Sequence, residues 1–309
     1  MNLRNFKIVK SEKDNKNLKF FLKSNWSKLQ KKYKKNGLLL FRGFDVKDLN
    51  DFNQAIKSIH KKVVNYTEGS TPRSKVKGKI YTSTEISSKR QIPLHNEMSY
   101  TSQYPKNLWF YAHKVSSKGG YTTVADSSKI YKQIPKEFKN KFEKKKVMYI
   151  RKYGIGFDLS WQKTFNTQSK IKVEEYCRKK KIKFSWTKKN NLVTWQVHRF
   201  SIYNKFLKKR IWFNQAHLFH HSNIDKKKKI LLKKIFKTNF YSRDSKFGDG
   251  SDIPKDYFVK INRILEKNSL NIKWKKNDIL LINNLAISHG RRKYSGDRKV
   301  YVAMTNDAA

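Results

Sequence analysis

The hydrophobic residues in the first half of this chain fall mainly into short runs that are typical of β-strands. The run Gly37–Phe44 predicts a buried strand, and residues 46–62 then carry apolar side chains at helical spacing. Residues 81–125 are strand-like, with an aromatic-rich run at 108–115 and a Gly-Gly turn at 119–120. The pattern therefore predicts a strand and a helix followed by several strands.

The middle of the chain alternates helical spacing with strands. Residues 184–202 predict a hairpin around the turn residues 189–191, and a further strand is expected at 211–215. Helical periodicity marks three segments, the first of which is expected to lie on the surface: residues 128–146, 225–236 and 256–268.

Two apolar, β-branched runs lie near the end of the chain. Asn277–Asn284 and Lys299–Thr305 flank a basic, glycine-containing segment at 290–297. Two such runs separated by turn residues are typical of a hairpin, so we expect the last piece of the chain to form one.

Strands in both halves with helices between them predict a mainly β fold with flanking helices, either a sandwich or a jelly roll. A length of 309 residues suits a single large β-rich domain. No internal repeat and no linker rich in Pro or Ser divides the sequence. We therefore expect one domain over residues 1–309, with helical insertions at approximately 128–146 and 225–270.

The composition is that of a folded protein in a reducing compartment. Hydrophobic residues make up 37% of the chain and include 20 Phe, 16 Tyr and 7 Trp, which is enough to bury a core. The single cysteine, Cys177, excludes an internal disulfide. The first ten residues lack the apolar stretch of a signal peptide, and no run approaches the ~18 apolar residues of a membrane span. We expect a soluble cytoplasmic protein without a membrane span.

The chain is strongly basic, with 72 Lys and Arg against 23 Asp and Glu and a formal charge of +49. Such a balance is compatible with a nucleic acid, an anionic lipid or an acidic protein partner. The excess is spread along the chain and is mostly Lys, whereas Arg is the residue that reads bases and phosphates bidentately. This favours a Lys-decorated solvated surface over a nucleic-acid site. Three segments have no Lys or Arg, and we expect chemistry there: Gln91–Pro105, 211–224 and 278–290.

A candidate metal motif lies in the first of these segments. On an extended strand His95 and Glu97 would share one face, with Cα atoms roughly 6.5–7 Å apart, so one imidazole and one carboxylate can converge on a metal. Two His and one carboxylate leave three positions open for a co-substrate and O₂ at ferrous iron. An isolated His-x-Glu pattern also occurs as surface polarity or around a core histidine, so a third ligand is required.

His289 stands out among the eight histidines by its surroundings. It follows an apolar run, and Arg298 comes nine residues later at the start of another apolar strand. Arg298 shares a strand face with Val300 and Val302, so its guanidinium lies on an apolar wall where it requires an anion. The distal carboxylate of 2-oxoglutarate suits that planar fork.

Ordered motifs across most of the chain resemble the taurine catabolism dioxygenase (TauD/TfdA) family, in particular its branch related to the syringomycin-biosynthesis hydroxylase. The motifs are GLLLFRGF at 37–44, YTSTEI at 81–86, PLHNEMSY at 93–100, GGYTTVAD at 119–126, LSWQKTF at 159–165, VEEYC at 173–177, WFNQAHLFH at 212–220, GDGS at 248–251 and SHGRRKYSGDRKVYVAM at 288–304.

The resemblance implies a double-stranded β-helix of the clavaminate synthase type. It further implies Fe(II) at His95, Glu97 and His289, and 2-oxoglutarate at Arg298 with Thr122 nearby. With O₂ as the second co-substrate, such an enzyme hydroxylates an amino acid or amino-acid-like small molecule, free or tethered to an acidic carrier protein, and releases succinate and CO₂. Desaturation and epoxidation share this iron chemistry. Related halogenases have Gly or Ala in place of the carboxylate ligand, so Glu97 argues against halogenation.

The chain departs from the family pattern at a few positions. Asn283-Asn284 replaces an acidic residue beside an Asn, and Asn277-Asp278 replaces Gly-Asp; neither pair is expected to touch the ligands. Lys299 beside Arg298 leaves a one-residue ambiguity, which strand parity and the bidentate geometry of Arg resolve in favour of Arg298.

A second group of histidines lies at 217–221 in the pattern His-x-x-His-His. A separate metal cluster is disfavoured because no acidic residue or Cys lies nearby in the sequence. We expect this segment to line the substrate pocket, with Asn214, His217 and Phe219 as substrate contacts, while core packing remains an equal alternative. The class of function that competes with an oxygenase is a non-catalytic polyanion-binding or nucleic-acid-binding protein that retains the fold.

Overall fold

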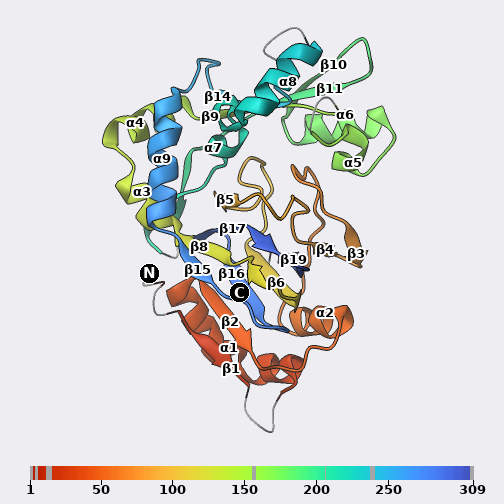
Figure 1. Ribbon diagram of the computed structural model, residues 1–309, viewed down its shortest axis with the longest axis vertical. Coiled ribbons are helices and arrows are strands. Elements are labelled where there is room, and N and C mark those ends of the chain that lie inside the picture. The colour runs from red at the N-terminus through yellow and green to blue at the C-terminus, as the bar shows by residue number, and fades with distance from the viewer. Residues whose placement is uncertain are drawn as a thin grey trace.

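The computed structural model describes residues 3, 6–11, 16–154, 158–205, 207–236 and 241–306. Two facing β-sheets form the centre of the molecule (Figure 1). The larger sheet has seven strands in the order β1 (Ile8–Lys10), β2 (Leu38–Arg42), β16 (Ile279–Asn283), β6 (Asn107–Lys114), β19 (Lys299–Thr305), β4 (Ile80–Thr82) and β3 (Lys75–Lys77). The smaller has four, in the order β15 (Leu270–Ile272), β8 (Thr122–Asp126), β17 (Ile287–Arg291) and β5 (Ile92–His95).

Strand alternation divides the larger sheet into two buried faces. In β6, Leu108 and Phe110 point into the core between the sheets, whereas Trp109 and Tyr111 point to the opposite face. Helices α1 (Leu18–Asn36) and α2 (Leu49–Lys57) cover that opposite face (Figure 1). Because both faces are covered, β6 is an almost continuous apolar run rather than an alternating one.

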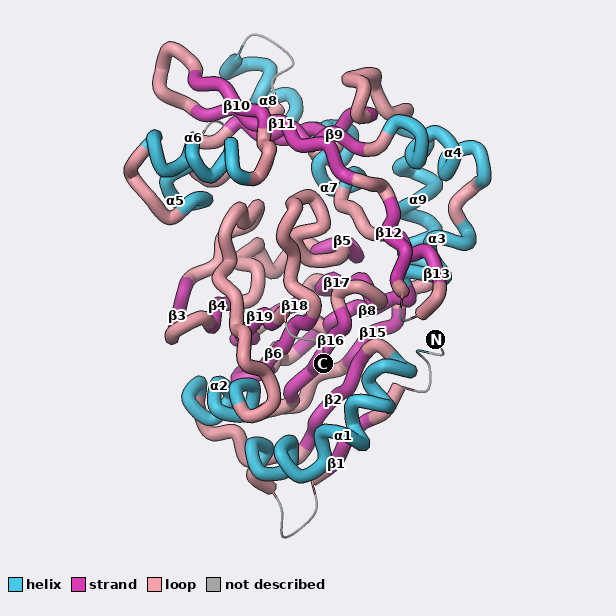
Figure 2. Tube along the Cα trace, turned by 180° about the vertical axis from the view of Figure 1, so that it is seen from behind, coloured by secondary structure: helices cyan, strands magenta, loops and turns pink. Residues whose placement is uncertain are grey.

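A second layer of elements lies on the β5 side of the smaller sheet (Figure 2). A four-stranded sheet runs in the order β10 (Lys183–Trp186), β11 (Leu192–His198), β9 (Val147–Lys152) and β14 (Arg243–Phe247). The short pairs are β12 (Ser201–Asn204) with β13 (Lys209–Trp212) and β7 (Lys118–Gly119) with β18 (Tyr294–Ser295). The helices are α3 (Ser127–Gln133), α4 (Lys136–Lys145), α5 (Trp161–Phe165), α6 (Lys170–Lys179), α7 (Ala216–Phe219), the 3₁₀ turn η2 (His221–Asn223), α8 (Lys226–Phe236) and α9 (Lys255–Lys267).

Two expectations about elements were wrong. The surface helix expected at 128–146 is two helices, α3 and α4, because Pro135 forces Ile134 into an extended conformation with ψ 133°. The expected C-terminal hairpin does not form, since β16 and β19 pair with β6 on opposite sides instead of with each other. The intervening residues cross to the smaller sheet as β17, which carries His289.

The hairpin expected at 184–202 is present as β10 and β11, with Asn190 in the left-handed region at φ 59°. Among the residues described, none of the helices has the length and hydrophobicity needed to cross a bilayer.

Candidate metal and co-substrate site

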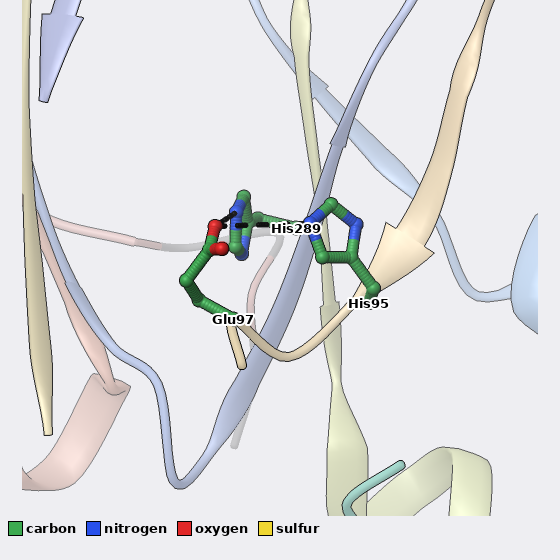
Figure 3. A group of neighbouring side chains, drawn as sticks. All are labelled: His95, Glu97 and His289. Carbon is green, nitrogen blue, oxygen red and sulfur yellow. Dashed lines mark ion pairs between the residues drawn. The ribbon is translucent and has the colours of Figure 1, made fainter. Parts of the chain in front are cut away.

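Three side chains converge at one end of the space between the two central sheets (Figure 3). Glu97 Oε2 lies 3.9 Å from His95 Nε2 and 3.6 Å from His289 Nε2. The two imidazole rings have centroids 4.5 Å apart, and all three residues are buried. The donor set of two His and one carboxylate expected from the sequence is therefore assembled in space.

The local geometry differs from the expected strand. Strand β5 ends at His95, and Glu97 lies in the following turn, where Met98 has a left-handed φ of 55°. Glu97 therefore does not reach the site through strand parity. His289 is directly opposite His95 in the antiparallel pair of β17 and β5, and this pairing brings the two imidazoles together.

The turn that carries Glu97 is held by buried amides. Asn284 accepts a hydrogen bond from Glu97 N at 2.7 Å and donates to Glu97 O at 3.0 Å. Asn96 in turn donates to the backbone carbonyl of Asn284 at 2.7 Å. Asn284, one of the positions that departs from the family pattern and was not expected to touch the ligands, thus fixes the backbone of one of them.

The other departure has a local explanation. Asn277 occupies the left-handed region at φ 66°, which Gly adopts freely and Asn tolerates. Asp278 is fully buried and accepts hydrogen bonds from Arg42 Nε and Nη2 at 2.9 and 2.7 Å. This ion pair holds the start of β16 against β2.

A buried arginine accompanies the three ligands. Arg73 Nη2 lies 2.7 Å from Glu97 Oε2, and its guanidinium stacks over Tyr66 at 4.8 Å. Burial alone would raise the pKa of Glu97, but Arg73, with His289 and His95, holds that pKa well below its usual value. Burial, reinforced by His289, lowers the pKa of His95 to about 3. The site thus holds an ionised carboxylate and a neutral imidazole at neutral pH.

These residues fit a ferrous ion. His95 Nδ1 is 2.9 Å from Pro93 O, so Nδ1 carries the proton and Nε2 presents its lone pair toward Glu97. Two imidazoles and a carboxylate on one side of a buried site are the ligand types of non-haem Fe(II) oxygenases.

A narrow cavity of about 30 Å³ adjoins the two histidines. Arg298 and Thr122 both line it, together with Val300. Arg298 Nε donates to Gly120 O at 3.2 Å, and Trp274 Nε1 donates to Thr122 Oγ1 at 3.1 Å. Burial, with Arg291 nearby, lowers the pKa of Arg298 to about 10, so this guanidinium remains cationic at neutral pH.

A larger cavity of about 530 Å³ also borders the ligands and includes His95 and Glu97 in its lining. Phe219, one of the expected substrate contacts, lines it, as do Gln215 and Leu218. Asn214 and His217 are not among its lining residues. Both side chains are buried and hydrogen-bonded to the backbone. Asn214 Nδ2 donates to Phe200 O at 2.8 Å, and His217 Nε2 donates to Leu94 O at 2.9 Å.

The buried His217 predicts that stability falls on acidification. Burial lowers its pKa to about 4, with the Leu94 hydrogen bond opposing the shift, whereas an unfolded histidine titrates near ~6.5. Between these values only the unfolded chain binds the proton. Each pH unit of acidification in this window therefore removes about 1.4 kcal/mol from the free energy of unfolding. Urea unfolding at pH 7, 6 and 5 measures this slope.

The variant His217→Asn should show a shallower dependence of unfolding free energy on pH than the wild type. An unchanged slope in His217→Asn would contradict this assignment.

Comparison with known proteins identifies a family and two similar sequences. The model of the taurine catabolism dioxygenase TauD, TfdA family matches residues 5–304. The chain is 35% identical over 268 residues to the dapdiamide synthesis protein DdaC of Enterobacter agglomerans, which covers 87% of this chain and 82% of that protein. It is 29% identical over 279 residues to a clavaminate synthase-like protein of Arabidopsis thaliana, with 87% and 81% covered.

Solved structures share the fold at low sequence identity. The crystal structure of AAD-2 in complex with Mn(II) and N-oxalylglycine superimposes with a TM-score of 0.54 at 14% identity, covering 97% of this chain and 94% of the other. A 2,4-D dioxygenase homologue from Burkholderia xenovorans gives a TM-score of 0.53 at 12% identity, covering 96% and 91%. The expected double-stranded β-helix, or jelly roll, is confirmed.

The fold and the site define a non-haem iron oxygenase. The chain belongs to the taurine catabolism dioxygenase (TauD/TfdA) family. It is an oxidoreductase of the dioxygenase type that uses Fe(II), 2-oxoglutarate and O₂.

Two residues of the site were missed in the sequence. Arg73 lies 24 residues before its partner Glu97, and no local pattern links the two. Asn284 was noticed only as a departure from the family, although a polar pair inside an apolar stretch is itself a sign of buried hydrogen bonding.

Proposed function

We propose that this dioxygenase hydroxylates an amino acid or amino-acid-like small molecule, with iron held by His95, Glu97 and His289. The convergence of the two Nε2 atoms on Glu97 Oε2, at 3.9 and 3.6 Å, carries the proposal. Loaded with iron, the site would supply O₂-dependent oxidation coupled to conversion of 2-oxoglutarate to succinate and CO₂.

Arg298 and Thr122 are proposed to hold 2-oxoglutarate. The Arg298 guanidinium is largely buried and has no ion-pair partner among the described residues, and the lining of its cavity also contains His95 and His289. A dicarboxylate could thus reach from Arg298 to the metal ligands.

The chain's own residues orient the site and exclude water. Arg73 directs the Glu97 carboxylate, and Asn284 fixes its backbone. Phe110 packs against the His289 ring at a centroid distance of 5.5 Å, which keeps water from that side. On the substrate side, Gln215 donates to Asn96 O at 2.8 Å and borders the larger cavity.

The larger cavity supports a zwitterionic substrate. Its lining has cationic side chains at Arg90 and Lys228 and anionic ones at Glu85 and Asp225. An amino acid carries both an ammonium and a carboxylate, so it has a partner of each sign there. The similarity to a protein of dapdiamide synthesis also supports a small-molecule substrate.

The basic surface supports a further proposal about delivery of the substrate. A formal charge of +49 favours an acidic carrier protein, to which the substrate would be tethered. The proposed location is the cytoplasm, consistent with a single cysteine that is buried.

Anaerobic spectroscopy tests the proposed iron centre. Addition of 2-oxoglutarate to the Fe(II)-loaded protein should produce a visible charge-transfer band that neither component gives alone. Candidate amino acids, free or carrier-bound, should then stimulate succinate formation and gain one oxygen atom. Absence of the band together with steeply salt-dependent binding to DNA or RNA would favour a polyanion-binding protein that retains the fold.

A further inference from the structure

A second group of metal-binding side chains lies outside the proposed iron centre. His220 and His221 follow helix α7, and Asp244 lies in strand β14. One ligand atom from each of the three residues lies within 4.8 Å of the others. The acidic partner that the sequence around the histidines lacks is thus supplied by a strand 23 residues further along the chain.

The geometry of this group suits a tetrahedral ion. His221 Nδ1 lies 3.2 and 3.3 Å from the two carboxylate oxygens of Asp244. Two ligand atoms of a tetrahedral zinc ion are roughly 3.3 Å apart, because each lies about 2.0–2.1 Å from the metal. His220 lies beside this pair, with its ring centroid 4.1 Å from that of His221.

The surrounding residues hold these side chains in place. His220 is buried, and its ring packs against Phe258 at 4.6 Å. His221 stacks on Tyr241 with the ring planes 16° apart. Asp244 Oδ1 also accepts hydrogen bonds from the backbone nitrogens of His221 and Ser245, at 3.1 and 2.9 Å. A preformed arrangement of this kind lowers the entropic cost of binding an ion.

We propose that His220, His221 and Asp244 form a second metal site, which takes a borderline divalent ion of the zinc class, with water completing its coordination. Two imidazoles and one carboxylate match the ligands of such ions, whereas Ca²⁺ and Mg²⁺ prefer oxygen ligands alone. His217 is not part of the site, since it does not belong to the group of ligand atoms that lie within 4.8 Å of one another.

An ion at this site would fasten the wall of the larger cavity. Asn223, Ile224 and Asp225 begin two residues after His221 and line that cavity, as does Arg243, which precedes Asp244. The ion would join the η2 turn to strand β14. The role we infer is ordering of the substrate-side wall, and it does not depend on the identity of the substrate.

The test uses a protein in which the proposed iron centre has been removed. In tag-free His95→Ala/Glu97→Gln protein, we expect one equivalent of Co²⁺ with the visible absorption of a tetrahedral ion, displaced by Zn²⁺. Adding His221→Ala or Asp244→Asn should weaken binding at least about 100-fold, since each removes a direct ligand. Asn at 244 keeps an oxygen that can accept both backbone hydrogen bonds, so this variant should fold.

Two further measurements separate a metal site from a structural His–Asp contact. Zn²⁺ should raise the Tm of the His95→Ala/Glu97→Gln protein and slow hydrogen exchange at residues 220–225, and Asp244→Asn should remove both effects. His198→Ala, which changes a histidine in the same sheet, should retain Co²⁺ binding. If the parent protein binds no Co²⁺, or if Asp244→Asn binds it equally well, the proposal is overturned.

Discussion

Replacing Glu97 with alanine is expected to abolish Fe(II) binding at the proposed centre and to lower succinate formation more than about 100-fold. Loss of a residue that only hydrogen-bonds to a metal ligand typically lowers metal affinity or activity by about 10–100-fold. Glu97 is itself a proposed ligand and the one carboxylate of the described three-residue set, so its loss should have a larger effect. Fe(II) binding is measured by anaerobic titration, and succinate formation in the presence and absence of candidate substrates.

The same substitution should also destabilise the protein, because Arg73 loses its partner. Its side chain is 3% exposed and lies 2.7 Å from Glu97 Oε2. An unpaired charge left in such a place costs about 3–5 kcal/mol. Urea unfolding of the metal-free protein should show a loss of this size.

Two variants separate the metal effect from the stability effect. Glu97→Gln keeps a hydrogen-bond acceptor for Arg73 but not the negative charge, so it should lose less stability than Glu97→Ala without restoring Fe(II) binding. Glu97→Ala/Arg73→Met removes both charges and should recover stability while remaining inactive. Full activity in any of these three proteins would contradict the role of Glu97 as a ligand.

The sequence predicted the candidate ligands better than the geometry that assembles them. His95, Glu97 and His289 lie in segments free of Lys and Arg, where a buried polar residue stands out from the Lys-rich surface. The strand expected at Glu97 was wrong, because Glu97 lies in a turn. The side chain of Asn284, far along the chain, accepts a hydrogen bond from the backbone nitrogen of Glu97 and donates one to its carbonyl oxygen. Long-range amide contacts of this kind leave no local periodicity to detect.

Other contacts could not be predicted because antiparallel pairing creates them. Asp244 meets His221 only because β14 pairs with β9 and places its first residues beside the η2 turn.

Helix α1 was not predicted because it is rich in Lys, although Leu18, Leu22 and Leu29 are buried. Tertiary packing, more than the local apolar pattern, stabilises such a helix.

Replacing Arg298 with glutamine is expected to raise the KM for 2-oxoglutarate by about 30-fold or more. Removing one partner of a largely buried charged pair costs at least about 2 kcal/mol, and each 1.4 kcal/mol is a factor of ten. Arg298→Lys should fall between the wild type and Arg298→Gln, because lysine keeps the charge and loses the planar fork. Calorimetric titration of N-oxalylglycine, an unreactive analogue, into the Mn(II)-loaded proteins measures binding without turnover.

Lys299 supplies the matched control for this prediction and tests the one-residue ambiguity. Its side chain is exposed at the start of β19, whereas Val300, Val302 and Met304 face the core between the sheets. A register shift separates Lys299 from Val300, so the position of Arg298 rests on the narrow cavity, which it lines with Val300. Lys299→Gln should therefore leave the KM for 2-oxoglutarate and the affinity for N-oxalylglycine unchanged. A large effect in Lys299→Gln together with none in Arg298→Gln would mean that Lys299, and not Arg298, binds the anion. The opposite face of β19 would then meet the co-substrate.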